Sequence, residues 1–133
     1  MILRFIIYGL LGWCIEIFWT GFGGALTGDR RFQGYTYLWM FPIYGSAVFL
    51  ERLHDMMIDW PILLRGGIWV FIIYGIEYAS GSLLRASIGL CPWNYDGAKY
   101  AVKGLIRLDY APAWFAAGLL FERIHLFLDR IGI

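Results

Sequence analysis

The residues most able to do chemistry in this 133-residue chain are four glutamates, each of which stands inside a long apolar stretch. They are Glu16, Glu51, Glu77 and Glu122. A carboxylate in hydrocarbon is costly, so an acid at membrane depth usually faces a protein interior or a watery cavity. A desolvated carboxyl group of this kind is a candidate for proton-coupled binding or for binding a cation.

Two of the glutamates begin the near-duplicate words Glu-Arg-x-His, which end at His54 and His125, the only histidines of the chain. One Glu on two helices and Glu-x-x-His on two others is the residue set of four-helix di-iron proteins. Depth argues against such a centre. Glu16 lies about 21 Å along its predicted helix, whereas Glu51 and Glu122 come near the ends of theirs, and metal ligands lie about 2 Å from one ion. We therefore expect no metal and no cofactor, with His54 and His125 as minor candidates for metal ligands.

The Glu-Arg-x-His words have a structural interpretation that we prefer to a catalytic one. Arg4 and Arg65 begin neighbouring apolar segments on the same side and are available to pair with the glutamates of the words. The arginines within the words can extend to the headgroup region. The expected structural ion-pair layer consists of Glu51, Arg52, Glu122 and Arg123.

Glu16 and Glu77 lie deeper, with no basic residue at their own depth in the sequence. They are either protonated and hydrogen-bonded, or they meet an arginine of the long loop that follows the third segment. Structural and functional interpretations of these two acids both stay open. The residues that we expect at a binding site are Glu16, Glu77, Tyr8, Tyr74, Arg85, Arg107, Trp93 and Tyr95.

The elements that must position these residues follow from composition and hydropathy. The chain is 60% hydrophobic and 16% charged, and soluble domains have about 25% charged residues. Four apolar segments, at about 2–22, 35–53, 66–84 and 111–128, each have the length that a helix needs to cross a bilayer. We predict an all-α membrane protein in which two helical hairpins form one domain over 1–133.

The long connection between the third and fourth segments has a mixed character. Residues 85–110 are too polar to span a membrane and too apolar for a free linker, so we expect them to pack at the membrane face or to fold partly back into the bundle. Pro92 and Asn94 favour a turn, which Trp93 and Tyr95 can anchor at the interface. We prefer a structural lid to a catalytic loop here.

Repeated sequence motifs suggest an internal duplication. The word Phe-Ile-Ile-Tyr-Gly at 5–9 recurs at 71–75, and the two Glu-Arg-x-His words alternate with it. This order would give two hairpins of like orientation. Glu16 and Glu77 do not align in this register, so duplication and chance similarity both stay open.

Several function classes are excluded or disfavoured. The net charge is +1, and no basic patch with interleaved aromatic residues indicates nucleic acid. The glycine run 21–24 lacks the Lys-Ser/Thr of a phosphate-binding loop, so we expect no ATP hydrolysis. No nucleophile elbow or zinc-spaced cluster is present, so we prefer a function other than catalysis, and the question of an enzymatic activity stays open. Five basic residues on one predicted side against six on the other leave the orientation open.

The acids belong to a longer pattern that is similar to the transmembrane protein 229 family, which is related to the Putative ABC-transporter type IV membrane family. The matching words cover nearly the whole chain in order. They are Tyr8-Gly9 with Gly12 and Glu16, 38–45 (Leu-Trp-Met-Phe-Pro-Ile-Tyr-Gly), 50–53 (Leu-Glu-Arg-Leu), Glu77-Tyr78 with Gly81 and Leu84-Arg85, 91–95 (Cys-Pro-Trp-Asn-Tyr), and 104–106 through Tyr110, Pro112 and Trp114-Phe115. Asn94 departs from the Asp that family members commonly carry. The resemblance implies a small multi-pass membrane protein and implies no particular activity.

The leading functional prediction is an integral membrane protein that binds or transports a small solute or lipid at a polar site around Glu16 and Glu77. The alternative is a non-transporting accessory or scaffold subunit of a membrane complex, and the third is a membrane metalloenzyme. The expected partners are the lipid bilayer and a second copy of the chain or another membrane subunit, and no nucleic acid.

Overall fold

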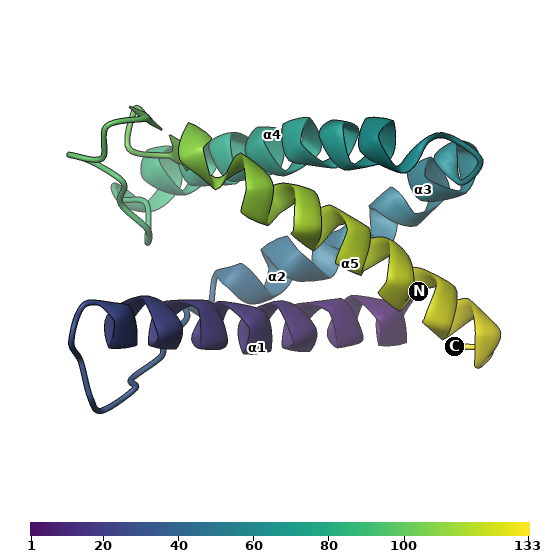
Figure 1. The fold of residues 1–133 in the computed structure, drawn as a ribbon, viewed down its shortest axis with the longest axis horizontal. Coiled ribbons are helices and arrows are strands. Elements are labelled where there is room, and N and C mark those ends of the chain that lie inside the picture. The colour runs from purple at the N-terminus through teal and green to yellow at the C-terminus, as the bar shows by residue number, and fades with distance from the viewer. The chain divides into compact units, whose positions relative to one another are not determined.

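Helices make up most of the chain in the computed structural model, which describes residues 1–133 (Figure 1). The predicted predominance of helix is confirmed. The elements are α1 (Ile2–Leu26), α2 (Met40–Gly45), the 3-10 helix η1 (Ser46–Leu50), α3 (Glu51–Met57), α4 (Ile62–Ile88), β1 (Ala101–Val102), β2 (Ile106–Arg107), the 3-10 helix η2 (Leu108–Tyr110) and α5 (Ala111–Arg130).

The chain divides into two units. The N-terminal unit comprises Met1–Glu51 together with Ile133, and the C-terminal unit comprises Arg52–Gly132. The expected single domain over 1–133 stays a prediction.

In the N-terminal unit, α1 packs against α2 and η1, and Figure 1 shows α2 lying along α1. The close approach depends on glycine. A Cβ atom at Gly12 would overlap the ring of Tyr44, and one at Gly9 would meet the ring of Phe41 at 2.7 Å. Small residues that let another helix come close are typical of membrane helix interfaces.

The second predicted helix, 35–53, differs most from the structure. Regular helix begins only at Met40 and then continues as α2, η1 and α3. Pro42 explains the late start, because its ring would clash with the carbonyl group of Leu38, four residues earlier, if the helix extended back that far. The preceding residues run alongside α1 instead: the Tyr35 N–H donates to Thr20 Oγ1 at 2.8 Å, and Trp13 Nε1 donates to the carbonyl of Tyr37 at 3.0 Å.

In the C-terminal unit, α4 packs against α5. Glycines again make the contact: a Cβ atom at Gly118 would overlap the Trp69 side chain, and one at Gly66 would overlap the ring of Phe115. The helix α4 extends one turn beyond each predicted end and stops before Gly89, whose φ of +81° is a common helix terminator.

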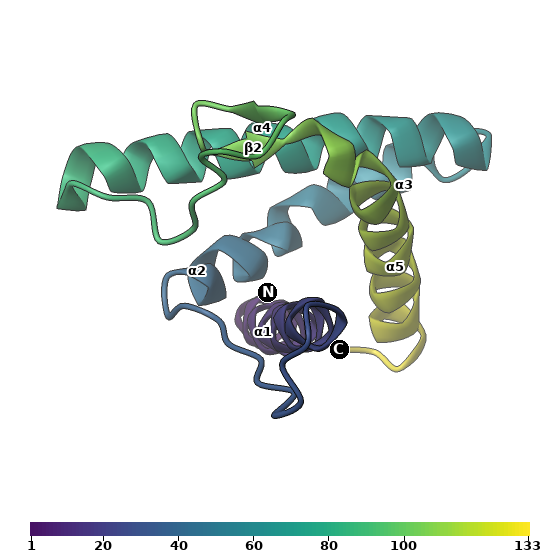
Figure 2. The same cartoon turned by 60° about the vertical axis from the view of Figure 1, so that its left-hand side comes forward.

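The long loop folds back along α4, as Figure 2 shows for β2. Its two short strands pair antiparallel, with Ala101 opposite Arg107. Three residues, 103–105, connect the strands: Lys103 and Gly104 have positive φ, 51° and 68°, and the Leu105 N–H donates to the carbonyl of Val102 at 3.0 Å. The Tyr74 hydroxyl on α4 donates to the carbonyls of Arg107 and Leu108 at 2.9 and 2.8 Å and fixes the far end of the hairpin.

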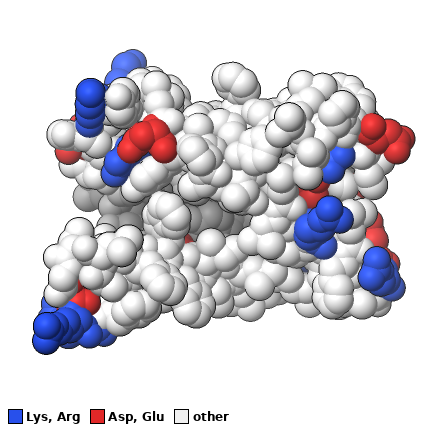
Figure 3. All heavy atoms as spheres, viewed as in Figure 1, with Lys and Arg blue, Asp and Glu red and all other residues white.

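Two helices, α1 and α4, are long and apolar enough to cross a membrane. Large apolar side chains are exposed along them, including Phe18 at 65%, Phe71 at 79% and Leu83 at 66%. On the visible face, Figure 3 shows the charged residues gathered toward the ends of these helices, with uncharged atoms along the lengths between. Soluble proteins rarely expose apolar area on this scale.

Candidate functional site

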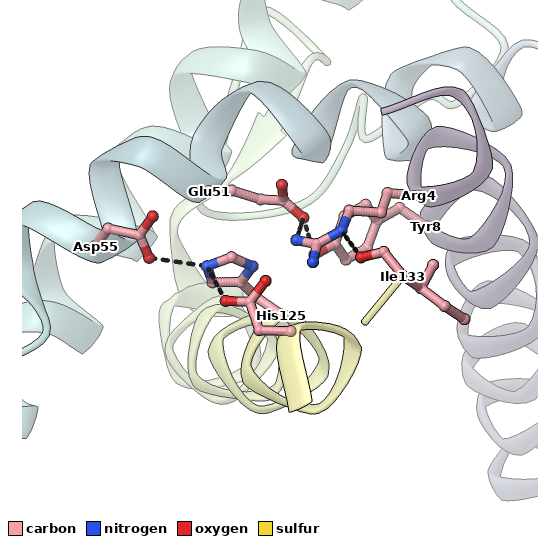
Figure 4. Close-up of polar contacts among 7 residues, drawn as sticks. Arg4, Tyr8, Glu51, Asp55, His125 and Ile133 are labelled. Carbon is pink, nitrogen blue, oxygen red and sulfur yellow. Dashed lines mark hydrogen bonds and ion pairs between the residues drawn. The ribbon is translucent and has the colours of Figure 1, made fainter. Parts of the chain in front are cut away.

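Glu51 is held by two donors from the first turns of α1. Arg4 Nη1 donates to Glu51 Oε1 at 2.9 Å, and the Tyr8 hydroxyl donates to the same oxygen at 2.7 Å (Figure 4). The side chains of Arg4 and Glu51 are only 13% and 14% exposed. Arg4 Nε also donates to the carbonyl of Ile133 at 2.5 Å. A charge-assisted pair with this little exposure holds the N-terminal unit together.

Glu122 has the corresponding arrangement in the C-terminal unit. Arg65 donates through Nε to Oε1 and through Nη2 to Oε2, each at 3.0 Å, and Trp69 Nε1 donates to Oε1 at 2.8 Å. Glu122 is 3% exposed. Arg65 Nη1 further donates to the carbonyls of Ile58 and Trp60 at 3.0 and 2.6 Å. The fork of guanidinium donors therefore satisfies both the carboxylate and the turn that precedes α4.

Arg4 and Arg65 are thus the arginines in contact with the two glutamates, which are the partners that the sequence offered. The arginines inside the Glu-Arg-x-His words, Arg52 and Arg123, are exposed.

Glu16 is half-buried near the middle of α1 and accepts hydrogen bonds from two neutral groups. The Thr36 hydroxyl donates to Glu16 Oε2 at 2.7 Å, and the Tyr44 hydroxyl donates to the same oxygen at 3.1 Å. Tyr44 lies on α2, and Thr36 lies in the extended stretch before it.

Glu77 occupies the matching place on α4 and is also half-buried. The Tyr95 hydroxyl donates to Oε1 at 3.4 Å, and Trp114 Nε1 donates to Oε2 at 3.1 Å. The rings of Tyr95 and Tyr110 are 5.7 Å apart, and those of Tyr110 and Trp114 are 5.9 Å apart, all edge to face. Glu77 therefore lies beside a cluster of three aromatic rings.

The remaining predicted site residues have other partners. Tyr8 contacts Glu51, as described, and Tyr74 holds the hairpin. Arg85 Nη1 donates to the carbonyl of Lys103 at 3.1 Å, and Trp93 Nε1 donates to that of Leu105 at 2.9 Å. These contacts fasten the long loop to itself and to α4.

Arg107 bonds within its own loop. Its Nη2 donates to Asp109 Oδ2 at 2.6 Å, and its guanidinium lies 4.4 Å from the centre of the Tyr110 ring. The hydrogen bond from Arg107 lowers the pKa of the Asp109 carboxyl. The contact with Tyr110 joins Arg107 to the aromatic cluster beside Glu77.

The structure reveals an alignment of the two units that the repeated sequence motifs did not. In each unit the first long helix carries an arginine, an aromatic donor four positions later and a glutamate eight positions after that. The arginine and the aromatic residue bind the glutamate of a Glu-Arg-x-His word, and the later glutamate accepts from an aromatic residue of the following helix. The two sets are Arg4, Tyr8 and Glu16, and Arg65, Trp69 and Glu77.

The sequence analysis named the two arginines and two of the tyrosines, Tyr8 and Tyr95, but it missed the other donors to the four glutamates. The missed residues are Thr36, Tyr44, Trp69 and Trp114. The shared spacing of arginine, aromatic residue and glutamate was the available signal, and it aligns Glu16 with Glu77, which the Phe-Ile-Ile-Tyr-Gly words do not.

The histidines of the two words also come together in the C-terminal unit. The ring centres of His54 and His125 are 5.1 Å apart, and the rings are edge to face. His54 is 1% exposed and His125 is 2% exposed.

Comparison with known proteins adds the family. No solved structure matches the chain. The model of the family described as "Putative ABC-transporter type IV" matches residues 3–131. Because this match covers nearly every residue described above, the chain belongs to the Putative ABC-transporter type IV family.

Proposed function

We propose that this chain is a multi-pass membrane protein of four spans that binds a small solute or lipid, and moves it, at polar sites around Glu16 and Glu77. The spans would be α1, the α2–α3 segment, α4 and α5. The finer resemblance to the transmembrane protein 229 family stays a prediction.

The observation that carries this proposal is the setting of the two deep acids. Each lies near the middle of a long apolar helix, and the donors named above for Glu16 and Glu77 are hydroxyl and indole groups, which carry no charge. An ionisable group at membrane depth is expensive and marks solute or ion pathways in other membrane proteins. Glu51 and Glu122 each bind an arginine.

The surroundings of Glu77 favour a positively charged ligand. A carboxylate beside Tyr95 and Trp114 combines a negative charge with aromatic rings, and both attract ammonium groups. Amines, quaternary ammonium compounds and lipids with such headgroups are the ligand class that we infer.

A scaffold role is the second candidate, and one observation favours it. Thr36 and Tyr44 tie α1 to the segment that follows it, so the hydrogen bonds of Glu16 also hold the N-terminal unit together. In that case the acids stabilise helices, and the chain serves as an accessory subunit. A second copy of the chain is the expected partner under the transport function, because four spans are few for a complete pathway.

Ligand-dependent stability separates these functions. The full chain in lipid nanodiscs would be heated with and without tetramethylammonium, ethylamine or phosphatidylcholine-rich lipid, and Tm would be followed for the wild type and for Glu77→Gln and Glu16→Gln. Asp59→Asn, an exposed acid in the turn before α4, is the matched control.

A ligand that binds only the folded state raises Tm. We expect at least one probe to raise the Tm of the wild type and of Asp59→Asn, and to leave the Tm of Glu77→Gln unchanged. Equal shifts in all variants, or no shift in the wild type together with a large loss of stability in both Gln variants, would support the scaffold role instead.

A further inference from the structure

One buried nitrogen atom in the C-terminal unit has no hydrogen-bond partner. It is Nδ1 of His54, in a residue that is 1% exposed. Buried polar atoms nearly always have a partner, and an orphaned one indicates strain, a water molecule or an ion. Because an unmet buried donor or acceptor is destabilising, this atom requires an explanation.

The groups around His54 are of the types that bind metal ions. His125, 2% exposed, faces it from α5. His125 Nε2 lies 2.9 Å from Asp55 Oδ1 and 3.5 Å from Asp129 Oδ2, and Figure 4 shows Asp55 reaching from α3 toward the imidazole. One ligand atom from each of His54, Asp55 and His125 lies within 4.8 Å of the other two.

We propose that His54, Asp55 and His125 bind a single divalent transition-metal ion, with Zn²⁺ as the best match. Imidazole nitrogen and carboxylate oxygen are zinc ligands at about 2.0–2.2 Å, and tetrahedral geometry places ligand atoms about 3.3 Å apart. The pair formed by His125 and Asp55 already has a spacing close to this. The ligand atoms lie within 4.8 Å of one another, so a movement of the His54 ring toward the other two groups would complete a three-residue set.

The surroundings of the cluster suit a site with one open position. The Asp55 side chain is 60% exposed, so solvent can reach the fourth coordination position, while both histidines are shielded. Glu122 stands one turn before His125 on α5, and its ion pair with Arg65 holds that turn in place. The bound ion would join α3 to α5 by a direct link.

This site uses His54 and His125 with Asp55 and none of the four glutamates of the di-iron set that depth argues against, and it does not depend on the proposed function. Its competitor is an ordinary His–Asp hydrogen bond in which Asp55 only orients His125. The two differ in a measurable way, because a hydrogen-bonded pair needs no metal, whereas a metal site loses stability when the ion is removed.

The test uses the full chain in detergent, stripped with a chelator and dialysed. Zn²⁺ binding would be titrated calorimetrically, and bound zinc would be counted by elemental analysis for the wild type, Asp55→Asn, His54→Gln and His125→Gln. Asp59→Asn is the matched control for Asp55→Asn, since both are exposed aspartates outside the long helices. Mg²⁺ serves as the hard-cation control, because it prefers oxygen ligands.

We expect one zinc per chain in the wild type and in Asp59→Asn, a Tm that rises with Zn²⁺ but not with Mg²⁺, and affinity lowered at least tenfold in Asp55→Asn. Asp55→Asn keeps the result interpretable if a buried histidine variant fails to fold. The proposal is overturned if the stripped wild type binds no stoichiometric zinc. It is also overturned if Asp55→Asn binds zinc as tightly as the wild type and the difference in Tm between this variant and the wild type is the same with and without Zn²⁺.

Discussion

At the scale of single residues, the four glutamates differ in what they bind. Glu51 and Glu122 each accept hydrogen bonds from an arginine and an aromatic residue, and these two donors share one helix, α1 for Glu51 and α4 for Glu122. Glu16 and Glu77 lie eight positions after those aromatic donors, about 12 Å further along a helix. Each unit therefore contains one acid at the level of its arginine and one acid at mid-helix.

Removal of Glu122 tests the structural half of this division. Glu122→Ala leaves Arg65, 14% exposed, and the indole of Trp69 without their acceptor. Breaking a buried ion pair by removing one partner costs about 3–5 kcal/mol. We expect a loss near 3 kcal/mol in the free energy of unfolding, measured by denaturant titration in mixed micelles.

The control for that loss is Asp29→Ala, whose partner Arg31 is 80% exposed. Exposed pairs contribute about 0–1 kcal/mol, so this variant should change stability little. If both variants lost the same small amount, the Glu122 pair would not stabilise the C-terminal unit.

The sequence allowed the arginine partners to be named because they begin the neighbouring apolar segments. The aromatic donors could not be chosen in the same way. The chain has seven tryptophans and nine tyrosines, and periodicity does not say which ring faces which acid. Thr36 was also out of reach, since its bond to Glu16 depends on an extended stretch that the apolar pattern predicts as helix.

At the scale of elements, glycines set how closely the helices approach. Gly118 on α5 and Gly75 on α4 are both helical, but a Cβ atom would overlap Trp69 at Gly118 and would meet nothing within 4 Å at Gly75. Their alanine variants therefore have opposite expected effects.

We expect Gly118→Ala to lower the free energy of unfolding by about 1–3 kcal/mol, because it overpacks the contact between α4 and α5. Gly75→Ala should leave stability unchanged or raise it by about 0.5–1 kcal/mol, since alanine is the better helix former. Thermal unfolding of both variants measures this. A Gly118→Ala protein as stable as Gly75→Ala would mean that α5 does not pack closely on α4.

Three of the four predicted helices occur in the structure with ends shifted by a few residues, because their apolar runs are long and free of proline in the interior. The second segment is different. Its hydropathy alone indicates one helix over 35–53, whereas Pro42 delays the start and the 3-10 helix η1 interrupts it. Proline at that position was the signal that the apolar run obscured.

At the scale of the whole molecule, the family and the two apolar helices α1 and α4 together indicate a membrane location. Two units with matched sets of arginine, aromatic residue and glutamate support a duplicated hairpin. Under the proposed four spans, both termini lie on the same side of the bilayer.

Labelling of engineered cysteines tests that arrangement. Cys14 and Cys91 are free and would first be replaced by alanine. Single cysteines at Ile2, which is 76% exposed, and at Ile133 would then be exposed to a membrane-impermeant reagent in sealed vesicles of known orientation. We expect both positions to be labelled from one side. Labelling from opposite sides would rule out four spans.

The central claim is that Glu16 and Glu77 serve function while Glu51 and Glu122 serve structure. Its most direct test is solute-driven proton movement into liposomes that hold a pH-sensitive dye, with ethylamine and tetramethylammonium as probes. We predict a protein-dependent signal for the wild type and for Asp59→Asn, and its loss in folded Glu16→Gln and Glu77→Gln. An undiminished signal in the Gln variants, or no signal from correctly inserted wild type, would contradict this assignment.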